Sequence, residues 1–153
     1  IDATAIVARL AYRQGNMPLA AQLVSSAFAA YRHNAWPNVE LMRRAIELPP
    51  LIAKMRPLAP AMTTTFDQPW SAGQWEEERR LRRILLDHEI FGCAASTMSA
   101  LHAVEPWPPW REDVLRIRRD CYAAAHDSRA EKAQQDLIDF FTNEPAKLLP
   151  PNH

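Results

Sequence analysis

Residues 8–27, which read ARLAYRQGNMPLAAQLVSSA, decide the fold of this chain. Apolar side chains recur there at the three- and four-residue spacing of a helix with one buried face, once before Gly15 and again after Pro18. The glycine lets the backbone reverse direction, and the proline suits the first turn of a helix. The stretch therefore predicts a hairpin of two antiparallel helices. Its expected buried faces are Ile6, Val7, Leu10 and Ala11, and then Ala20, Leu23, Val24, Ala27, Phe28 and Tyr31.

The segment that follows this hairpin is dominated by proline. The two helices of the hairpin are expected at about 2–14 and 18–34, and Asn38 is a suitable cap for a third helix that ends before Pro49. Pro49, Pro50, Pro57, Pro60 and Pro69 all fall within residues 49–70. Long helices do not tolerate that density of prolines, so we expect a Pro-rich irregular insert with one helical turn at about 50–56.

Two capping-box patterns mark the helices of the second half. Ser71 with Gln74, and Ser128 with Glu131, have the spacing in which a serine and a glutamine or glutamate close the start of a helix. The helix after Ser71 is expected to pair Glu76 with Arg80 and Glu78 with Arg82, four residues apart. Gly92 and the EPWPPW connector at 105–110 separate the next helices. We expect one all-α domain over 1–145, with antiparallel hairpins at about 2–34, 72–105 and 111–144, and a tail at 146–153.

Composition narrows the classes of function. The chain has 153 residues, of which 48% are hydrophobic and 24% charged, so it can bury a core. Its 18 basic residues balance 18 acidic ones, which argues against nucleic acid as a partner. Its apolar runs are too short to cross a bilayer, so we expect no membrane insertion.

The two cysteines bear on the compartment. Cys93 and Cys121 each fall in an apolar helical stripe, and we expect reduced core thiols rather than a disulfide. Reduced thiols and the lack of a signal peptide indicate a cytoplasmic protein. The start at Ile1 indicates a fragment of a longer chain or a processed product. The excess of arginine over lysine and the abundance of alanine are typical of bacterial proteins.

Patterns that carry catalysis or metal binding do not stand out. The serines lie in predicted helices without a GxSxG elbow, and the three glycines are too scattered for a phosphate loop. Asp87, His88 and Glu89 are the tightest group of metal-capable side chains, but neighbours on a helix point in different directions. We therefore interpret these three as solvated polar positions and expect no catalytic residue, metal or cofactor.

Small residues in the first hairpin bring a family resemblance. Ala8, Gly15, Ala20, Val24 and Ala27 stand where tetratricopeptide (TPR) repeats place small residues at the helix crossing, a turn glycine and a late apolar position. The first hairpin therefore resembles such a repeat. Matching positions in the other hairpins are Phe91, Ala94, Met98 and Pro106, and Cys121, Ala133, Leu137 and Pro145. The resemblance implies hairpins stacked as a right-handed solenoid or as a compact bundle.

The same resemblance implies a binding groove, because the first helix of each TPR repeat faces the ligand. The corresponding residues here are Arg9, Tyr12, Arg13, Arg79, Arg83, Arg118 and Tyr122. Arginine binds carboxylates through paired hydrogen bonds, so the expected ligand is an acidic peptide or one that ends in a carboxylate. The alternative is that these arginines pair with their own glutamate and aspartate neighbours on ordinary wet helix surfaces.

The tryptophans allow two interpretations. Trp36, Trp70, Trp75, Trp107 and Trp110 all fall near helix junctions, most of them beside proline. They either plug the helix ends and seal the core, or form an exposed aromatic patch used for docking.

Together these features favour a protein-interaction or scaffolding module over an enzyme. It would bind a peptide or partner domain, acidic in character, through the Arg/Tyr-lined groove. One alternative is a non-catalytic accessory domain of a larger enzyme. The QPW sequence at 68–70 and the helix that contains EEERRLRR at 76–83 are similar to helical regions appended to spermidine-synthase-like bacterial proteins. The other alternative is a helical enzyme or small-ligand binder.

Overall fold

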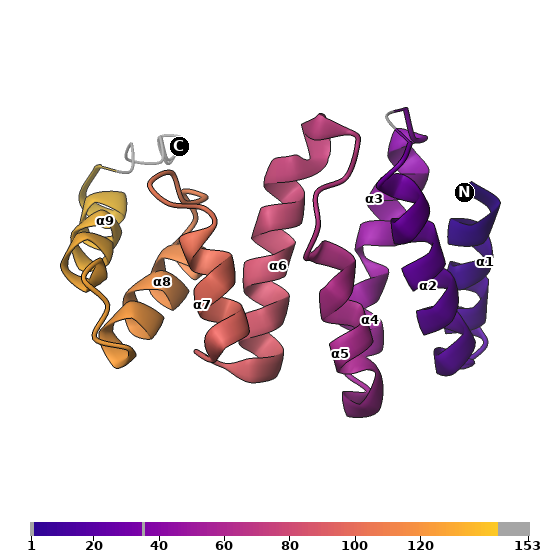
Figure 1. Cartoon of the computed structure of the whole chain (residues 1–153), viewed down its shortest axis with the longest axis horizontal. Coiled ribbons are helices and arrows are strands. Elements are labelled where there is room, and N and C mark those ends of the chain that lie inside the picture. Colours follow the sequence, from indigo (N-terminus) through magenta and orange to yellow (C-terminus); the bar gives the residue numbers. More distant parts are fainter. Residues whose placement is uncertain (1, 35, 144–153) are drawn as a thin grey trace, which may run out of the picture. The chain divides into compact units, whose positions relative to one another are not determined.

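The computed structural model describes residues 2–34 and 36–143, and every regular element in them is a helix (Figure 1). The prediction of an all-α chain is thereby confirmed for this part of the sequence. The chain divides into two compact units, residues 1–90 and 91–153, and each is described by itself. The predicted second hairpin, 72–105, straddles the boundary between them. The predicted tail at 146–153 lies outside the described residues.

The first unit opens with the expected helical hairpin. Gly15 has a positive φ of 78°, which lets the chain reverse between the two helices. Asn16 then caps the second helix, because its side chain accepts a hydrogen bond from the backbone N–H of Leu19 at 3.3 Å. The α-helices of this unit are α1 (Asp2–Arg13), α2 (Met17–Tyr31), α3 (Val39–Ile46), α4 (Leu48–Ala53), α5 (Ala59–Thr63) and α6 (Glu76–Phe91), with 3₁₀ turns at Arg56–Leu58, Thr64–Phe66 and Gly73–Trp75.

The helices α1 and α2 lie side by side and pack against each other (Figure 1). Both carry buried alanines: Ala5, Ala8 and Ala11 on α1, and Ala20, Ala21 and Ala27 on α2. Methyl groups let the two backbones approach closely. The predicted burial of Ile6, Val7 and Leu10 is wrong, since these side chains are 54%, 46% and 52% exposed. The alanine face of α1 meets α2, and the large apolar side chains consequently point away from it.

Aromatic rings tie α2 to the chain that follows α5. The ring of Phe28 lies with its centroid 5.8 Å from that of Phe66 and 5.2 Å from that of Trp70. All three rings are buried, and Tyr31 packs edge-on against Phe28 at 5.6 Å. The core of the first unit is therefore built on the face of α2 that the sequence pattern predicted.

The Pro-rich segment is more regular than expected. Residues 48–66 form α4, α5 and two 3₁₀ turns, so the prediction of irregular chain here is wrong. The prolines of this stretch stand in the first turn of α4, α5 and the 3₁₀ turn at Arg56–Leu58, where a missing N–H leaves no bond unmade. A proline-dense sequence thus yields several very short helices instead of a single long one.

The start of α6 also differs from the prediction. Ser71 does not cap this helix. Its hydroxyl donates to the backbone carbonyl of Arg32, and its N–H donates to that of Tyr31 at 3.2 Å. Ser71 therefore closes the end of α2. The expected ion pairs along α6 are confirmed, with Glu76 2.8 Å from Arg80 and Glu78 2.7 Å from Arg82.

The second unit contains α7 (Ala95–His102), α8 (Glu112–Ala124) and α9 (Ala130–Asn143). The hairpin predicted at 111–144 is confirmed as α8 packed on α9, within the described residues. His126, with a φ of 51°, turns the chain between these helices. Asp127, not the predicted Ser128, supplies the acceptor at the start of α9, for the N–H of Arg129 at 2.8 Å. Buried at the centre are Val114, Leu115, Cys121, Tyr122, Ala133 and Leu137.

Cys93 and Cys121 form a disulfide, with their Cα atoms 5.0 Å apart. The expectation of two reduced core thiols is wrong. Cys121 is buried in α8, but Cys93 is exposed in the bend that precedes α7 and not inside an apolar helical stripe. The cysteines consequently lend no support to a cytoplasmic location.

The methyl contact between α1 and α2 is open to a direct test. We expect Ala20→Leu to lower the free energy of unfolding by about 1–3 kcal/mol, because the extra atoms overpack the crossing. Ala29→Leu is the matched control, since Ala29 lies on the exposed side of the same helix. Urea denaturation measures both. Equal stability of the two variants would contradict a tight crossing.

Candidate partner-binding surface

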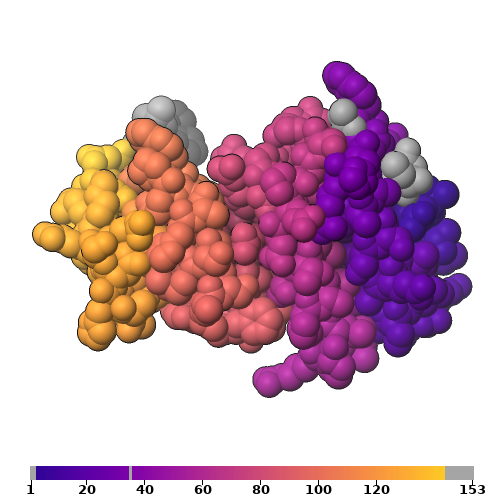
Figure 2. Space-filling view, in the orientation of Figure 1, coloured from indigo at the N-terminus to yellow at the C-terminus, as the bar shows by residue number. Residues whose placement is uncertain are grey.

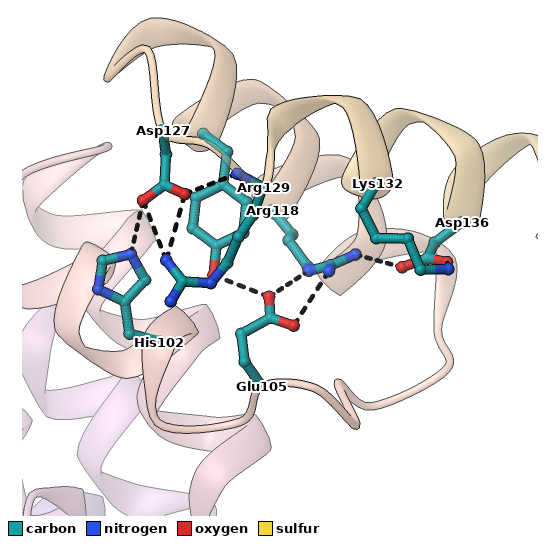
Figure 3. A network of polar contacts seen from close by, with 8 residues as sticks. His102, Glu105, Arg118, Asp127, Arg129, Lys132 and Asp136 are labelled. Carbon is teal, nitrogen blue, oxygen red and sulfur yellow. Dashed lines mark hydrogen bonds and ion pairs between the residues drawn. The ribbon is translucent and has the colours of Figure 1, made fainter.

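Two of the predicted groove residues, Arg118 and Tyr122, are buried inside the second unit and bind its own carboxylates. Figure 3 shows Arg118 between Glu105 and Asp136. Arg118 donates from Nε to Glu105 at 2.6 Å and from a terminal nitrogen to Asp136, also at 2.6 Å. The hydroxyl of Tyr122 donates to Glu105 at 2.8 Å. Lys132 adds a further hydrogen bond to Asp136. These contacts join the connector before α8 to α8 and α9.

The network holds its groups in their charged or donating forms. Burial alone would raise the pKa of Asp136, but hydrogen bonds from Lys132 and Arg118 outweigh it and set that pKa below its usual value. Burial would likewise lower the pKa of Arg118, yet its bonds to Glu105 and Asp136 raise it. Burial, followed by the bond to Glu105, raises the pKa of Tyr122 and keeps its hydroxyl protonated. Arg118 and Asp136 therefore both stay charged, and they form a hydrogen bond with each other inside the unit.

A second branch of this network involves His102. Its Nε2 lies 2.9 Å from a carboxylate oxygen of Asp127, which also pairs with Arg129 at 3.2 Å (Figure 3). The backbone N–H of Arg129, and after it His102, lower the pKa of Asp127. This branch connects the end of α7 to the turn between α8 and α9. These paired charges thus link α7, the connector, α8 and α9 of the second unit.

The predicted groove residues of α6 are also paired within their own unit. Arg79 is buried, lies 2.6 Å from Glu76, and donates to the backbone carbonyl of Phe66. Arg83 lies 3.3 Å from Asp67 and 3.8 Å from Asp87. Asp87 is fully buried, so its assignment as a solvated position is wrong. These arginines pair with carboxylates of their own unit, as the alternative to a groove proposed, but Arg79 does so in a buried position and not on a wet helix surface.

The remaining predicted residues, Arg9, Tyr12 and Arg13, do lie together on α1. They line a hollow of about 200 Å³ with Glu47, Leu48 and Leu51. Arg9 reaches Glu47 at 3.7 Å, and both side chains are nearly half exposed. Arg13 is exposed, and it takes part in none of the ion pairs found among the described residues. Among the predicted groove residues that the structure describes, Arg9 and Arg13 are the exposed cations.

Apolar side chains adjoin these arginines. A second hollow, of about 230 Å³, is lined by Ala5, Ile6, Arg9, Leu10, Arg13, Leu41 and Arg44. We call these seven residues the α1 surface, and the indigo atoms of α1 are visible at the exterior in Figure 2. Sequence reasoning missed the apolar members, because it assigned Ile6 and Leu10 to the core. The spacing of Ala5, Ala8 and Ala11 was the signal that an alanine face points inward.

The α1 surface carries an excess of positive charge. It contains three arginines and no carboxylate among its own residues. At its margin, Arg44 lies 2.7 Å from Glu40, which also binds Arg43. Hydrogen bonds from Arg43 and then Arg44 lower the pKa of Glu40 to about 2, so this carboxylate stays ionised. The surface therefore combines exposed apolar side chains with arginines that can donate hydrogen bonds to a ligand.

The tryptophans divide between the two interpretations. Trp70 is buried and Trp75 partly buried, as expected of rings that seal a core. Trp36, Trp107 and Trp110 are exposed. Sequence position beside proline therefore does not by itself decide whether a tryptophan is inside.

Comparisons with protein-family models, with curated proteins and with solved structures find no match for this chain. The relationship to TPR repeats stays a prediction. Among the described residues, no helix is both long enough and apolar enough to pass through a bilayer. Inference about function therefore begins from the α1 surface.

The contribution of the buried ion network to stability can be tested by removing Arg118. We expect Arg118→Met to lower the free energy of unfolding of the second unit by about 3–5 kcal/mol, because Glu105 and Asp136 would lose the charge that both share and keep only Tyr122 and Lys132. Arg119→Met is the control, since Arg119 pairs with the exposed Asp120 and its loss should cost about 1 kcal/mol or less. Hydrogen exchange of α8 and α9 amides reports the difference. Similar effects for both variants would contradict the network's role.

Acid should weaken the second unit in a defined direction. Asp127 and Asp136 have folded-state pKa values below the ordinary 3.8, so their contribution is fully present above that pH. It is lost as pH falls through the lower folded values, because protons then bind the unfolded chain first. We expect the urea midpoint to fall between about pH 5 and about pH 2. Asp136→Asn should make that fall shallower, and a flat profile in the unmodified chain would oppose this account.

Proposed function

We propose that this chain is a protein-interaction module whose α1 surface binds an acidic amphipathic helix of a partner protein. One observation carries the proposal: α1 turns Ile6, Val7 and Leu10 outward while alanines fill its inward face. Neighbouring large apolar side chains on an exposed helix face commonly mark an interaction site. The helical hairpins then act as a TPR-like scaffold that presents this face.

The apolar hollow favours a helix as the occupant. Ile6 and Leu10 are four residues apart on α1, and Leu41 faces them from α3. Two adjacent helices with apolar side chains between them form the kind of groove into which an amphipathic helix lays its own apolar face. Fully burying one such side chain contributes about 1.5–3 kcal/mol. Covering the hollow would therefore supply a useful share of the binding free energy.

The arginines favour acidic residues on that helix. Arg9, Arg13 and Arg44 surround the apolar side chains, and guanidinium groups bind carboxylates through two parallel hydrogen bonds. A ligand with glutamates or aspartates beside its apolar face would meet both kinds of group at once. Opposite charges would also speed the encounter at low salt.

We assign no catalytic role to the chain. The acidic helix belongs, in this proposal, to a separate partner. A helix supplied by a neighbouring domain of a longer chain would instead make the module an accessory domain.

The binding test uses a designed peptide and heteronuclear NMR of the chain. The peptide is an amphipathic helix with leucines on one face and glutamates beside them, compared with a scrambled sequence and with a lysine version. We expect the acidic helix to shift the resonances of α1 and α3 and to bind at least about tenfold more tightly than the other two. Equal affinity for all three peptides would overturn the proposal.

Variants separate the apolar and charged parts of the site. Leu10→Ser should weaken binding, and Arg13→Glu should weaken it and reduce its salt dependence. Val39→Ser and Arg56→Glu are matched controls, because both residues are exposed on the first unit and lie outside the α1 surface. Circular dichroism confirms that each variant remains helical. Losses as large in the controls as in the α1 variants would count against this site.

A further inference from the structure

The second unit carries an aromatic pocket that shares no residue with the α1 surface. It is a shallow hollow, largely open to solvent, with a volume of about 590 Å³. Its lining residues, which we call the Trp110 pocket, are Trp110, Arg111, Glu112, Asp113, Arg116 and Phe140. The rings of Trp110 and Phe140 lie 6.2 Å apart at their centroids, tilted by 56°. Trp110 is 53% exposed, so one ring of the wall faces solvent.

The lining of the Trp110 pocket is electrically balanced. Arg111 pairs with Asp113 at 2.7 Å, and Arg116 pairs with Glu112 at 2.8 Å. Two cations and two carboxylates leave no net charge, so a charged ligand gains little there. The pocket thus differs in chemistry from the cationic α1 surface.

The same groups are complementary to an indole ring. Trp110 and Phe140 offer aromatic faces and edges against which another ring can pack. Guanidinium groups bind the faces of aromatic rings, as Arg116 already does to Phe141 at 5.3 Å. The carboxylates of Glu112 and Asp113 can accept the indole N–H, which needs a partner once it is buried. A tryptophan side chain would satisfy each part of this lining.

An exposed indole stands a few residues away in the same unit. Trp107 is 86% exposed and precedes Trp110 by three residues in the connector between α7 and α8. Pro106, Pro108 and Pro109 surround it in sequence, and the fixed φ of proline limits the conformations that this connector can adopt. The side chain of Trp107 therefore faces solvent and is not packed against the other residues that the structure describes.

We infer that a second copy of this chain fills the Trp110 pocket, with Trp107 of each copy inserted into the pocket of the other. In a dimer with a two-fold axis, a contact from one copy to the other is repeated in the reverse direction. Trp107 and the pocket lie on one unit, so in this proposal one two-fold axis relates both contacts. Buried tryptophans at the centre of an interface commonly contribute much of the binding free energy.

Sedimentation of the whole chain over a range of concentrations tests this dimer. We expect a reversible monomer–dimer equilibrium, and we expect Trp107→Ala to raise its Kd by at least about tenfold. Trp36→Ala is the matched control, because Trp36 is 92% exposed but belongs to the first unit. A chain that stays monomeric at millimolar concentration would overturn the inference. So would a Trp36→Ala variant that weakens association as much as Trp107→Ala.

A mixing experiment distinguishes insertion into the pocket from loss of general stickiness. Trp107→Ala keeps the pocket, whereas Trp110→Ala keeps the inserted tryptophan, and neither variant alone can form a complete contact. An equimolar mixture restores one of the two contacts, so we expect the mixed pair to associate more tightly than either variant with itself. A mixture that associates no better than the separate variants would contradict the reciprocal arrangement. Peptide binding at the α1 surface should be the same in both variants, which separates this test from that of the proposed function.

Discussion

The close approach of α1 and α2 is the constraint on which the first unit depends. Only methyl side chains, such as those of Ala8 and Ala20, leave the two backbones room to pack without a gap. Because alanines occupy the buried face of α1, its larger apolar residues lie on the exposed face. The packing of the hairpin and the exposure of Ile6 and Leu10 thus both follow from the alanines on the buried face of α1. A helix that looks like an ordinary amphipathic core helix becomes one whose apolar side faces water.

The second unit is organised by a different kind of contact. Arg118 is nearly inaccessible to water, and two carboxylates from separate segments converge on it. Taking such charges out of water is costly, so an ion pair of this kind contributes little net stability. Its geometry is demanding, however, since a guanidinium donates hydrogen bonds to carboxylates close to the plane of its nitrogens. We infer that the network fixes how the connector, α8 and α9 meet. Trp107 and Trp110 belong to this connector, and both are exposed.

Local patterns predicted local features well. The hairpin, the α3 helix capped by Asn38 and the Glu76–Arg80 pair all follow from residues a few positions apart. The errors arose where partners are distant in sequence. Ser71 closes α2 instead of opening α6, and Cys93 finds Cys121 across 28 residues. Of the predicted groove residues, Arg9 and Arg13 on α1 are exposed, Tyr12 is partly buried against the core, and Arg79 and Arg118 are buried with carboxylates. Spacing shows which residues share a helix face, but not which face turns inward.

Both cysteines of the sequence belong to the second unit, and the first has none. The bond between them shortens the loop that the unfolded second unit can explore, which removes conformational freedom that folding would otherwise have to overcome. Reducing agents would restore that freedom to the segment between Cys93 and Cys121, which carries the connector with Trp107 and Trp110 and the helix with Arg118. The thiol–disulfide balance of the surroundings therefore acts directly on the segment in which the centre of the ion network and these two exposed tryptophans lie.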